Sequence, residues 1–496
     1  MKYVSTRSSA EKVDAAQAIV AGLAPDGGLY VPESFPAFAL SRVKDMAEQS
    51  YPDRAREVMG AYLTDFTEEE LRACASQAYA SGRFGDNPAP LKAVGDLHVL
   101  ELWHGPTHAF KDMALQMLPR LMPLAMKKTG VDKQVFILVA TSGDTGKAAL
   151  EGFCGVEGTQ VGVFYPVDGV SPAQKLQMIT QEGANTHVCA VKGNFDDAQT
   201  GVKRIFGDAD FARELADKGV ELSSANSINW GRLVPQVAYY FSAYADLLKS
   251  GAIALGDEVN YCVPTGNFGN ILAAYYAKRM GLPVGRLVCA SNANNVLFDF
   301  IEQGVYNANR PFHKTTSPSM DILVSSNLER LLYELCDRDG EQVNAWMQAL
   351  KSGGEYAVGE QVHRALLESF AAGWADDEKA MEAIARVHAE CDYTMDPHTA
   401  VAWSVAETYR AHTGDRRPMV VVSTASPYKF SRSVLSALCG AEAVQNLDEF
   451  ACADALEKAC GLPMPASLRD LRNKEKRHND VVEPAQMAEE VRHWLG

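Results

Sequence analysis

A lysine beside apolar residues is the first candidate for chemistry in this sequence. Thr107 can cap a helix that begins at His108, which places Lys111 in the first helical turn. Helical spacing groups this lysine on one face with three apolar residues: Ala114, Leu115 and Leu118. Desolvation and the positive end of the helix dipole both disfavour an ammonium ion there, so the pattern predicts a neutral amine able to attack a carbonyl group. The alternative is an ordinary lysine whose amine reaches solvent.

A second candidate is a loop that could hold an anion, Thr141-Ser142-Gly143-Asp144-Thr145-Gly146-Lys147-Ala148. It follows an apolar run and opens a helix, where free backbone N–H groups and the helix dipole favour negative charge. A nucleotide-binding P-loop would have Gly where this chain has Thr141, and Ser or Thr where it has Ala148, so that interpretation fails. The same residues also suit an ordinary turn between a strand and a helix.

The loop Pro264-Thr265-Gly266-Asn267-Phe268-Gly269-Asn270 has the same position between an apolar run and a helical pattern. Its glycines allow the backbone to curl around a phosphate. A nicotinamide-dinucleotide site would have Gly in place of Phe268, which weakens that interpretation. Two anion-binding loops in one chain suggest two phosphates, or a phosphate and a carboxylate, in one cleft. A reactive lysine together with a phosphate-binding loop points to pyridoxal 5'-phosphate as the cofactor.

The elements that must position these residues alternate between strands and helices from Gln134 onwards. Short apolar runs rich in β-branched residues predict strands at 134–141, 160–167, 186–191, 260–264, 286–290 and 419–423. Helical patterns cover residues 146–155, 172–182, 196–206, 233–249 and 270–280. This alternation predicts a parallel sheet covered by helices, with ligands bound in the loops at the carboxyl ends of the strands.

Two further stretches stand apart from this alternation. Residues 307–321 form a long irregular loop, and long loops in compact domains are often functional. Residues 466–484 are charge-rich, which is typical of a solvated linker, and Pro484 could open a last short helix that ends at Trp494.

Length and charge narrow the class of function. The chain has 496 residues and a formal net charge of −16 at pH 7, so its overall field repels nucleic acids and anionic lipids. A phosphorylated substrate would therefore need a local basic pocket. No apolar stretch is long enough for a transmembrane helix, and the N-terminus lacks the apolar core of a signal peptide. The ten cysteines have neither CxxC nor zinc-ligand spacing, which predicts a cytoplasmic protein without a metal site.

Six motifs resemble those of one enzyme family. They are His104-Gly-Pro-Thr-His-Ala-Phe-Lys111-Asp, Ser142-Gly-Asp-Thr-Gly146, Asn226-Ser-Ile-Asn-Trp-Gly-Arg232, Gly266-Asn-Phe-Gly-Asn270, Ser317-Pro-Ser-Met-Asp321 and Asp396-Pro-His-Thr399. Together they are similar to the motifs of threonine synthases, most closely the longer bacterial and fungal branch, and the similarity extends from Tyr3–Arg7 to Ser423–Ser431. Related dehydratases carry Asn-His where this chain has Asp144-Thr145, which disfavours that subfamily.

The resemblance implies a fold and a reaction. The fold is α/β and of fold type II among pyridoxal-phosphate enzymes, related to the tryptophan synthase β subunit. It has two parallel or mixed sheets flanked by helices, with an N-terminal α/β segment. The reaction converts O-phospho-L-homoserine and water to L-threonine and phosphate by γ-elimination and β-addition, the last step of threonine biosynthesis. Such an enzyme is a lyase, and a monomer or homodimer is expected.

The resemblance also implies two sets of site residues. Lys111 carries the cofactor and acts as the base at the substrate. The rest of the cofactor set is Gly266, Asn267, Phe268, Gly269 and Asn270 around the cofactor phosphate, with Thr424 at the pyridine nitrogen. The substrate set is Ser142, Asp144, Thr145, Ser227, Asn229 and Arg232. Arg232 is expected to face the substrate phosphate, and Asp144 to turn its carboxylate away or to cap the helix. His398 is either a proton shuttle or a residue that shapes its turn.

Three regions are expected along the chain. They are an N-terminal domain at 1–92, a catalytic core at 93–440 with a smaller lobe at about 130–225, and a C-terminal helical extension at 441–496. Two other functions stay open at this point. One is a serine or threonine dehydratase, or another β-replacement enzyme of the same fold. The other is a non-catalytic protein of the threonine-synthase type that binds the cofactor or an amino acid as a sensor.

Overall fold

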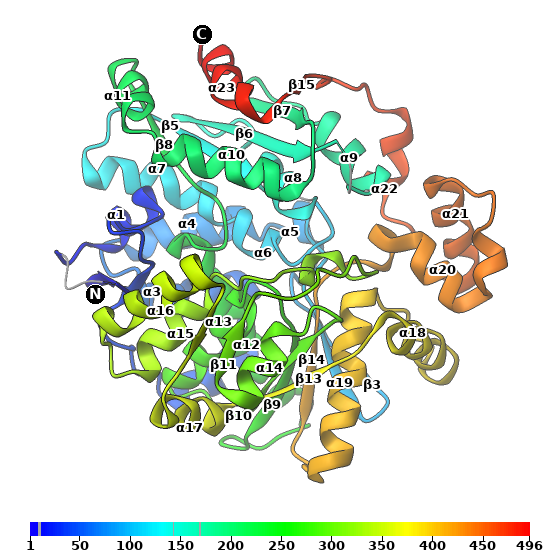
Figure 1. Cartoon of the computed structure of the whole chain (residues 1–496). Coiled ribbons are helices and arrows are strands. Elements are labelled where there is room, and N and C mark those ends of the chain that lie inside the picture. Colours follow the sequence, from blue (N-terminus) through cyan, green and yellow to red (C-terminus); the bar gives the residue numbers. More distant parts are fainter. Residues whose placement is uncertain (8–10, 142, 168–169) are drawn as a thin grey trace.

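A six-stranded sheet lies at the centre of the larger lobe of the computed structural model (Figure 1). The structure describes residues 1–7, 11–141, 143–167 and 170–496. The strand order is β13 (Phe370–Trp374), β10 (Val284–Ser291), β9 (Val259–Pro264), β14 (Met419–Ser423), β4 (Leu97–Glu101) and β3 (Leu91–Val94). The strands pair in parallel, except that the edge strand β3 is antiparallel to β4. Strands β9 and β14 are buried along their whole length, as expected for parallel strands covered on both faces.

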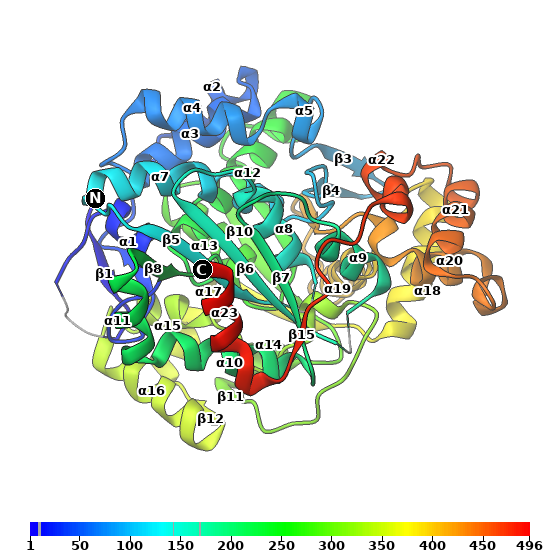
Figure 2. The same cartoon turned by 90° about the horizontal axis from the view of Figure 1, so that it is seen from above.

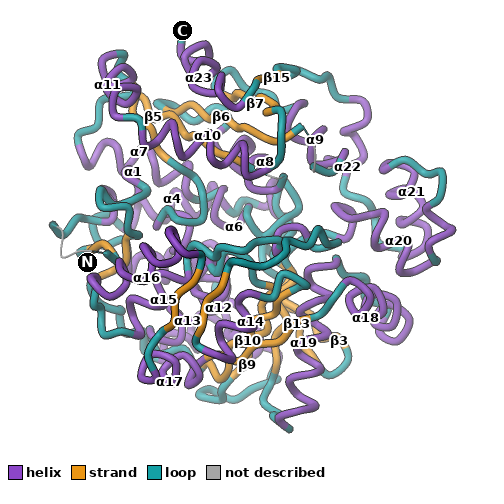
Figure 3. The backbone as a smooth tube through the Cα atoms, viewed as in Figure 1, coloured by secondary structure: helices purple, strands orange, loops and turns teal. Residues whose placement is uncertain are grey.

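A second sheet, of five parallel strands, forms the smaller lobe. Its order is β15 (Val481–Val482), β7 (Thr186–Val191), β6 (Thr159–Pro166), β5 (Gln134–Ala140) and β8 (Val220–Ser223). Figure 3 shows the two sheets as separate groups of strands, with helices and loops between them. All six predicted strands form, as β5, β6, β7, β9, β10 and β14. The predicted α/β fold with parallel and mixed sheets is confirmed.

Helices flank both sheets, and the five helices predicted from periodicity all form with slightly different ends. The helices of the smaller lobe are α8 (Asp144–Phe153), α9 (Pro172–Ile179), α10 (Phe195–Gly207) and α11 (Ala209–Asp217). Those of the larger lobe are α12 (Trp230–Ser250), α13 (Gly269–Arg279), α14 (Val296–Gln303), α15 (Leu328–Leu335), α16 (Gly340–Gly353), α17 (Glu360–Ser369), α18 (Asp377–Cys391) and α19 (Pro397–Thr413). Helix α12 begins before the predicted Leu233 because the Asn229 side chain accepts the Gly231 N–H and caps the helix.

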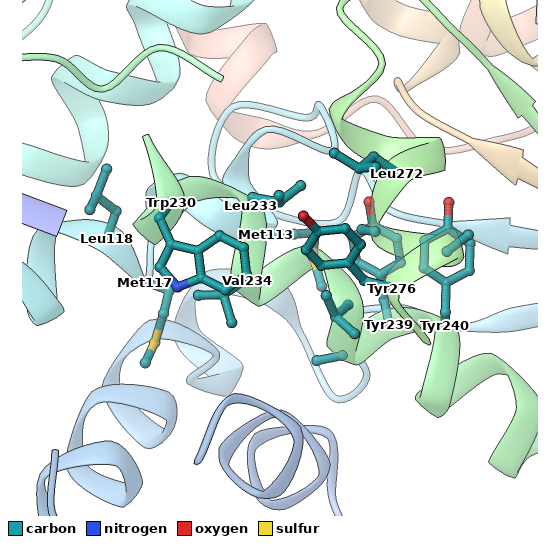
Figure 4. Packing of buried hydrophobic residues seen from close by; sticks show 14 of the residues in the cluster. Met113, Met117, Leu118, Trp230, Leu233, Val234, Tyr239, Tyr240, Leu272 and Tyr276 are labelled. Carbon is teal, nitrogen blue, oxygen red and sulfur yellow. The ribbon is translucent and has the colours of Figure 1, made fainter. Parts of the chain in front are cut away.

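The N-terminal segment packs against α12. Strands β1 (Tyr3–Ser5) and β2 (Tyr30–Pro32) pair antiparallel, and α1 (Ala15–Ala21) lies between them in the chain. Four helices follow β2: α2 (Leu40–Asp45), α3 (Tyr51–Tyr62), α4 (Glu68–Ala78) and α5 (Ser81–Phe84). Helix α3 lies along α12, and α1 packs on α7 (Leu118–Thr129). The buried core between these layers contains Trp230, Tyr239 and Tyr276 together with Met113 and Met117 (Figure 4). Met113 and Met117 are both fully buried there.

Residues 441–496 contain helices and also the short strand β15. Helix α20 (Ser431–Cys439) is followed by α21 (Glu449–Cys460) and α22 (Ala466–Arg469). The chain then crosses to the smaller lobe. There β15 pairs with β7, and α23 (Met487–Leu495) lies over the sheet (Figure 2). Trp494 stacks on Phe164 and His187. The linker expected at 466–484 thus contains structured segments, because the apolar pair Val481-Val482 completes a sheet edge.

Two observations complete the fold. The loop 307–321 is largely irregular, as predicted, and contains the short 3₁₀ helix η2 (Pro318–Met320). It follows strand β11 (Val305–Asn307), which pairs with β12 (Glu355–Ala357). In the part of the chain that the structure describes, no helix has the length and apolar character needed to cross a membrane.

Candidate functional site

Lys111 lies directly before a helix and not in its first turn. The helix α6 (Asp112–Leu115) begins one residue later, and Lys111 occupies its N-cap position. Thr107 does not cap a helix, because both its backbone N–H and its hydroxyl donate to the Asp112 carboxylate, at 2.8 and 2.7 Å. The Lys111 side chain is nearly buried, and its Nζ lies 3.2 Å from Ser319 Oγ and 3.4 Å from Asp144 Oδ2. The expected helix start was wrong, but the predicted burial of the lysine is observed.

The surroundings of Lys111 favour a neutral amine. Burial lowers the pKa of Lys111, and the charges of Arg232 and Lys429 lower it further, while Asp144 alone acts in the opposite direction. The net shift of the pKa is downward. A lysine amine that loses its proton more easily is a better nucleophile toward a carbonyl group.

Asp144 is the carboxylate at the centre of this cluster. Its Oδ1 lies 2.6 Å from Lys429 Nζ and accepts a hydrogen bond of 2.9 Å from Gln174 Nε2, while Oδ2 faces Lys111. Burial opposes ionisation, but Lys429 and Lys111 together hold the pKa of Asp144 well below its usual range. The expectation that Asp144 turns away or caps α8 was therefore wrong, because two buried lysines attract its carboxylate.

Lys429 is a site residue that sequence reasoning missed. It follows β14, is almost completely buried and donates to Thr107 O at 3.0 Å and to Gln177 Oε1 at 3.1 Å, besides its contact with Asp144. It lies in the segment Ser423–Ser431, where the only available signal was its place within a motif. Its position in a short 3₁₀ turn gives no periodic pattern that would indicate burial.

The Gly266–Asn270 loop leads from β9 into α13 and presents free backbone N–H groups. Two of its carbonyl oxygens accept hydrogen bonds from side chains: Gly266 O accepts from Ser325 Oγ at 2.7 Å, and Asn267 O accepts from Asn327 Nδ2 at 3.0 Å. Among the described residues, the backbone N–H groups of 266–270 donate to no protein acceptor. Unpaired amides at the start of a helix form a site for an anion such as a phosphate.

The two glycines of this loop differ in their surroundings. A Cβ atom on Gly266 would lie 2.6 Å from the Ser319 carbonyl oxygen, so only glycine fits there. A Cβ atom on Gly269 would meet nothing closer than 3.5 Å. The positive φ of 65° belongs to Phe268 and not to either glycine. Because Ser319 touches both Gly266 and Lys111, the loop and the lysine border the same space.

Asn270 adds a side-chain donor to this loop. Its Oδ1 accepts hydrogen bonds from the hydroxyls of Tyr239 and Tyr240, at 2.5 and 2.7 Å. With its oxygen at this end of the amide, its Nδ2 is buried without a partner in the described part of the chain. An unpaired buried donor beside free amides fits a phosphate group.

Arg232 brings a third cation to the cluster. It is buried in the first turn of α12, and its Nη1 donates to Ala225 O at 2.9 Å. Burial lowers its pKa to about 10, and no carboxylate forms an ion pair with it among the residues that the structure describes. A buried guanidinium without a counter-ion is suited to bind an anion.

The other predicted substrate residues have different roles in the fold. Asn229 caps α12, and its Nδ2 donates to Ile19 O and Ser224 O, both at 3.0 Å, so its amide donors are already used. Ser227 is half-buried in the loop before that cap. Thr145 is half-buried in the first turn of α8. Ser142 lies outside the described residues.

In the turn before α8, the Thr141 side chain accepts hydrogen bonds from some of the backbone N–H groups. Thr141 Oγ1 accepts the N–H groups of Gly143 and Gly146, each at 3.0 Å. Within the described residues, Asp144 and Thr145 contribute the N–H groups of this turn that have no protein acceptor. Among its described residues, this turn therefore offers fewer free donors than the Gly266–Asn270 loop.

Thr424 and His398 are each hydrogen-bonded to a segment next to Lys111. The Thr424 carbonyl accepts the Phe110 N–H at 2.8 Å, which places Thr424 against the segment that carries the lysine. His398 Nε2 accepts the Ser319 N–H at 3.1 Å, and its Nδ1 donates to Asp396 Oδ2 at 2.6 Å. Both ring nitrogens of His398 hold backbone or turn structure, which favours the turn-shaping role over that of a proton shuttle.

Comparison with known proteins agrees with these features. The family model described as "Pyridoxal-phosphate dependent enzyme" matches residues 88–425, and models described as "Threonine synthase N terminus" and "Threonine synthase, C-terminal" match 2–79 and 399–493. Threonine synthase from Pseudomonas aeruginosa is 40% identical over 449 residues, which cover 89% of this chain and 91% of that protein. The chain belongs to the threonine synthase family. The resemblance drawn from the six motifs is confirmed.

Two further members show the extent of the likeness within the threonine synthase family. The solved structure of pyridoxal-phosphate-bound threonine synthase from Brucella melitensis matches with a TM-score of 0.86 at 38% identity, over 100% of this chain and 99% of that one. Human threonine synthase-like 1 is 40% identical over 455 residues, which cover 88% of this chain, but the chain spans 60% of the length of that relative. The predicted cofactor, pyridoxal phosphate, is confirmed at the level of the family.

Proposed function

We propose that this protein is a threonine synthase that converts O-phospho-L-homoserine and water to L-threonine and phosphate. The observation that carries the proposal is Arg232, a buried guanidinium without a carboxylate partner in the described residues, close to Lys111. Lys111 and Lys429 both contact the Asp144 carboxylate, and the nearby Arg232 adds a cation without a carboxylate partner among the described residues, so the site is locally cationic in a chain with a net charge of −16. A substrate with a phosphate group supplies the missing negative charge.

The family cofactor fits the residues around Lys111. The free amides of the Gly266–Asn270 loop and the Asn270 side chain would hold its phosphate, Lys111 would hold its aldehyde carbon, and the Thr424 hydroxyl would lie at its ring nitrogen. When bound, pyridoxal phosphate supplies an electron-accepting ring that stabilises negative charge on the substrate carbons. A hydroxyl at the ring nitrogen would not force that nitrogen to carry a full positive charge, as a carboxylate would.

The remaining residues are assigned to the substrate. Lys111 is the base that moves protons at the substrate Cα and Cβ, because burial lowers its pKa and so favours the neutral amine that can accept a proton. Arg232 binds the substrate phosphate, aided by Ser142, Thr145 and Ser227. Asn229 acts indirectly, since it caps the helix that carries Arg232. Asp144 and Lys429 hold the charge balance around the lysine amine.

The decisive experiment supplies O-phospho-L-homoserine to the purified protein with pyridoxal phosphate and measures threonine and phosphate together. Equal amounts of the two products support the proposal. A ketoacid with ammonia would instead indicate a dehydratase of the same fold. Cofactor binding without any product would indicate a non-catalytic member of the family. The proposal includes a cytoplasmic location, a monomer or homodimer, and the domain limits near residues 92 and 440.

A further inference from the structure

A buried arginine in the larger lobe is bonded to segments on both sides of the candidate site. Arg330, in α15, is 0% exposed. Its Nε donates to Tyr30 O at 3.0 Å, and its Nη2 donates to Ile228 O at 2.6 Å. Its Nη1 donates to Asn327 Oδ1. One planar guanidinium therefore joins the N-terminal strand β2, the loop before α12 and the start of α15.

Asn327 extends this connection to the Gly266–Asn270 loop. Its Oδ1 accepts from Arg330, while its backbone N–H and its Nδ2 both donate to the Asn267 carbonyl, at 3.1 and 3.0 Å. The carbonyl of Asn267 is thereby held by Asn327, while the backbone N–H groups of residues 266–270 have no protein acceptor among the described residues. Arg330 thus orients the amide whose nitrogen holds the candidate cofactor loop.

Ile228 extends the connection to Arg232. Its carbonyl lies one residue before Asn229, the cap of α12, and Arg232 stands in the first turn of that helix. The bond from Arg330 fixes this loop from one side, and the bonds from Asn229 Nδ2 to Ile19 O and Ser224 O fix it from the other. The direction of the α12 start, and with it the position of Arg232, depends on both.

The role of Arg330 is not that of an ordinary ion pair. Burial lowers its pKa to about 10, and within the described residues no carboxylate bonds to its guanidinium. The neighbouring Glu329 directs its carboxylate to Thr6 and Arg7 instead. The arginine directs its donors to neutral oxygens of three segments, which a lysine cannot do because it lacks the planar fork.

We propose that Arg330 is a positioning residue that sets the cofactor-phosphate loop and the substrate-phosphate arginine at a fixed separation. The identity of the two phosphates rests on the proposed function, whereas the coupling rests on the hydrogen bonds of one side chain. Loss of Arg330 should therefore weaken both anion sites together, although the side chain touches neither ligand.

The test compares two variants by measurements that need no turnover. The first is the dissociation constant of pyridoxal phosphate from the full chain, followed by cofactor absorbance. The second is the dissociation constant of inorganic phosphate from the cofactor-loaded protein, measured by calorimetry. Arg330→Lys should weaken both constants by roughly tenfold or more, the effect of a lost charge-assisted hydrogen bond. Asn327→Asp keeps the acceptor for Arg330 but places an oxygen against the Asn267 carbonyl, so it should weaken cofactor binding alone.

A matched control separates positioning from general stability. Arg54 is also buried (5% exposed) and donates to backbone carbonyls of Met46 and Ala47, and it differs from Arg330 in pairing with Asp246, near the end of α12 that is remote from Arg232. Arg54→Lys should lower the unfolding midpoint without changing either dissociation constant. If Arg330→Lys behaves in the same way, with both constants normal, the proposal is overturned. If Arg330→Lys does not fold, Asn327→Asp decides, because normal cofactor affinity in that variant also overturns it.

These measurements remain separable from the proposed function. Where the protein releases no threonine but Arg330→Lys still weakens both constants, the proposed reaction fails and the coupling stands. Where the reaction proceeds, Arg330→Lys should raise KM for O-phospho-L-homoserine more than it lowers kcat at saturating cofactor. A stability defect alone would leave KM unchanged in the folded fraction.

Discussion

Lys429 Nζ lies 2.6 Å from Asp144 Oδ1, and both side chains are almost completely buried. The partners come from different lobes: Asp144 opens α8 in the smaller lobe, and Lys429 follows β14 in the larger. A buried pair of this kind contributes little net stability, but removal of one partner leaves a buried charge without compensation. The pair therefore ties the two lobes together at the point where Lys111 is held.

We expect Lys429→Met to lower the free energy of unfolding by up to about 3–5 kcal/mol, because the buried Asp144 would lose its closer cation and keep only Lys111, at 3.4 Å. The double variant Lys429→Met with Asp144→Asn should recover much of that loss, since the buried carboxylate is then removed and the pKa of Lys111, already lowered by burial, falls further toward the neutral amine. Urea unfolding followed by tryptophan fluorescence measures both. A single variant that unfolds like the parent protein would show that the pair is not buried in solution.

Stability should depend on pH through Asp144. Burial opposes its ionisation, yet Lys429 and Lys111 hold its pKa below the ordinary value. A carboxyl with a depressed folded-state pKa stabilises the protein at pH values above its unfolded pKa of about 4, and this contribution is lost as the pH falls. The free energy of unfolding should therefore drop more steeply between about pH 5 and 2 in the parent than in Asp144→Asn. Parallel pH profiles for the two proteins would contradict this.

Lys111→Ala should abolish the absorption band of lysine-bound cofactor, because the buried amine is the assigned attachment point. Some cofactor can still bind without a covalent bond through the Gly266–Asn270 loop. Borohydride reduction and peptide mapping of the parent protein should place the pyridoxyl group on Lys111. Recovery of that group on another lysine, such as Lys429, would disprove the assignment.

Gly266→Ala should weaken cofactor retention, because its Cβ atom would collide with the Ser319 carbonyl and displace η2 or the loop. Gly269→Ala is the matched control, since its Cβ atom would have ordinary contact distances. The cofactor dissociation constant of each variant is measured by titration of the apoprotein. Equal affinities in the two variants would remove Gly266 from the assigned cradle.

Arg232→Ala should reduce kcat/KM for O-phospho-L-homoserine by about 2–4 kcal/mol of transition-state binding, the cost of a lost charge-assisted contact in a closed site. The absorption band of the bound cofactor should stay intact, since Arg232 is assigned to the substrate. Arg232→Lys keeps the charge without the planar fork, and its rate separates the two contributions. Normal turnover in Arg232→Ala would place the substrate phosphate elsewhere.

The sheets could be predicted from sequence because their strands are short continuous apolar runs. The run that forms β9, for example, is buried at every position and is followed directly by glycines. The same logic located Lys111 and the Gly266–Asn270 loop, because each follows from local spacing. The start of α6 was misplaced because the Asp112 carboxylate takes both Thr107 donors, a competition that helical periodicity does not reveal.

Contacts between distant segments were beyond the reach of local patterns. The orientation of Asp144 depends on Lys429, far along the chain and outside any amphipathic helix, so the carboxylate was expected to face away. The return of the chain to the smaller lobe was missed for a similar reason. Only two valines of the charge-rich stretch 466–484 form the strand, and so short a run is not distinguishable from a linker by composition.

The pairing of β15, near the end of the chain, with β7 has a consequence while the protein is being synthesised. Strand β7 leaves the ribosome long before Val481-Val482, and until then one edge of the smaller sheet has no neighbour. At roughly 5–20 residues per second the interval is on the order of tens of seconds. An open parallel edge is a template for pairing with other chains, so the nascent lobe passes through a period in which it depends on chaperones or on its own slow docking. The last strand to be made is the one that ends this exposure.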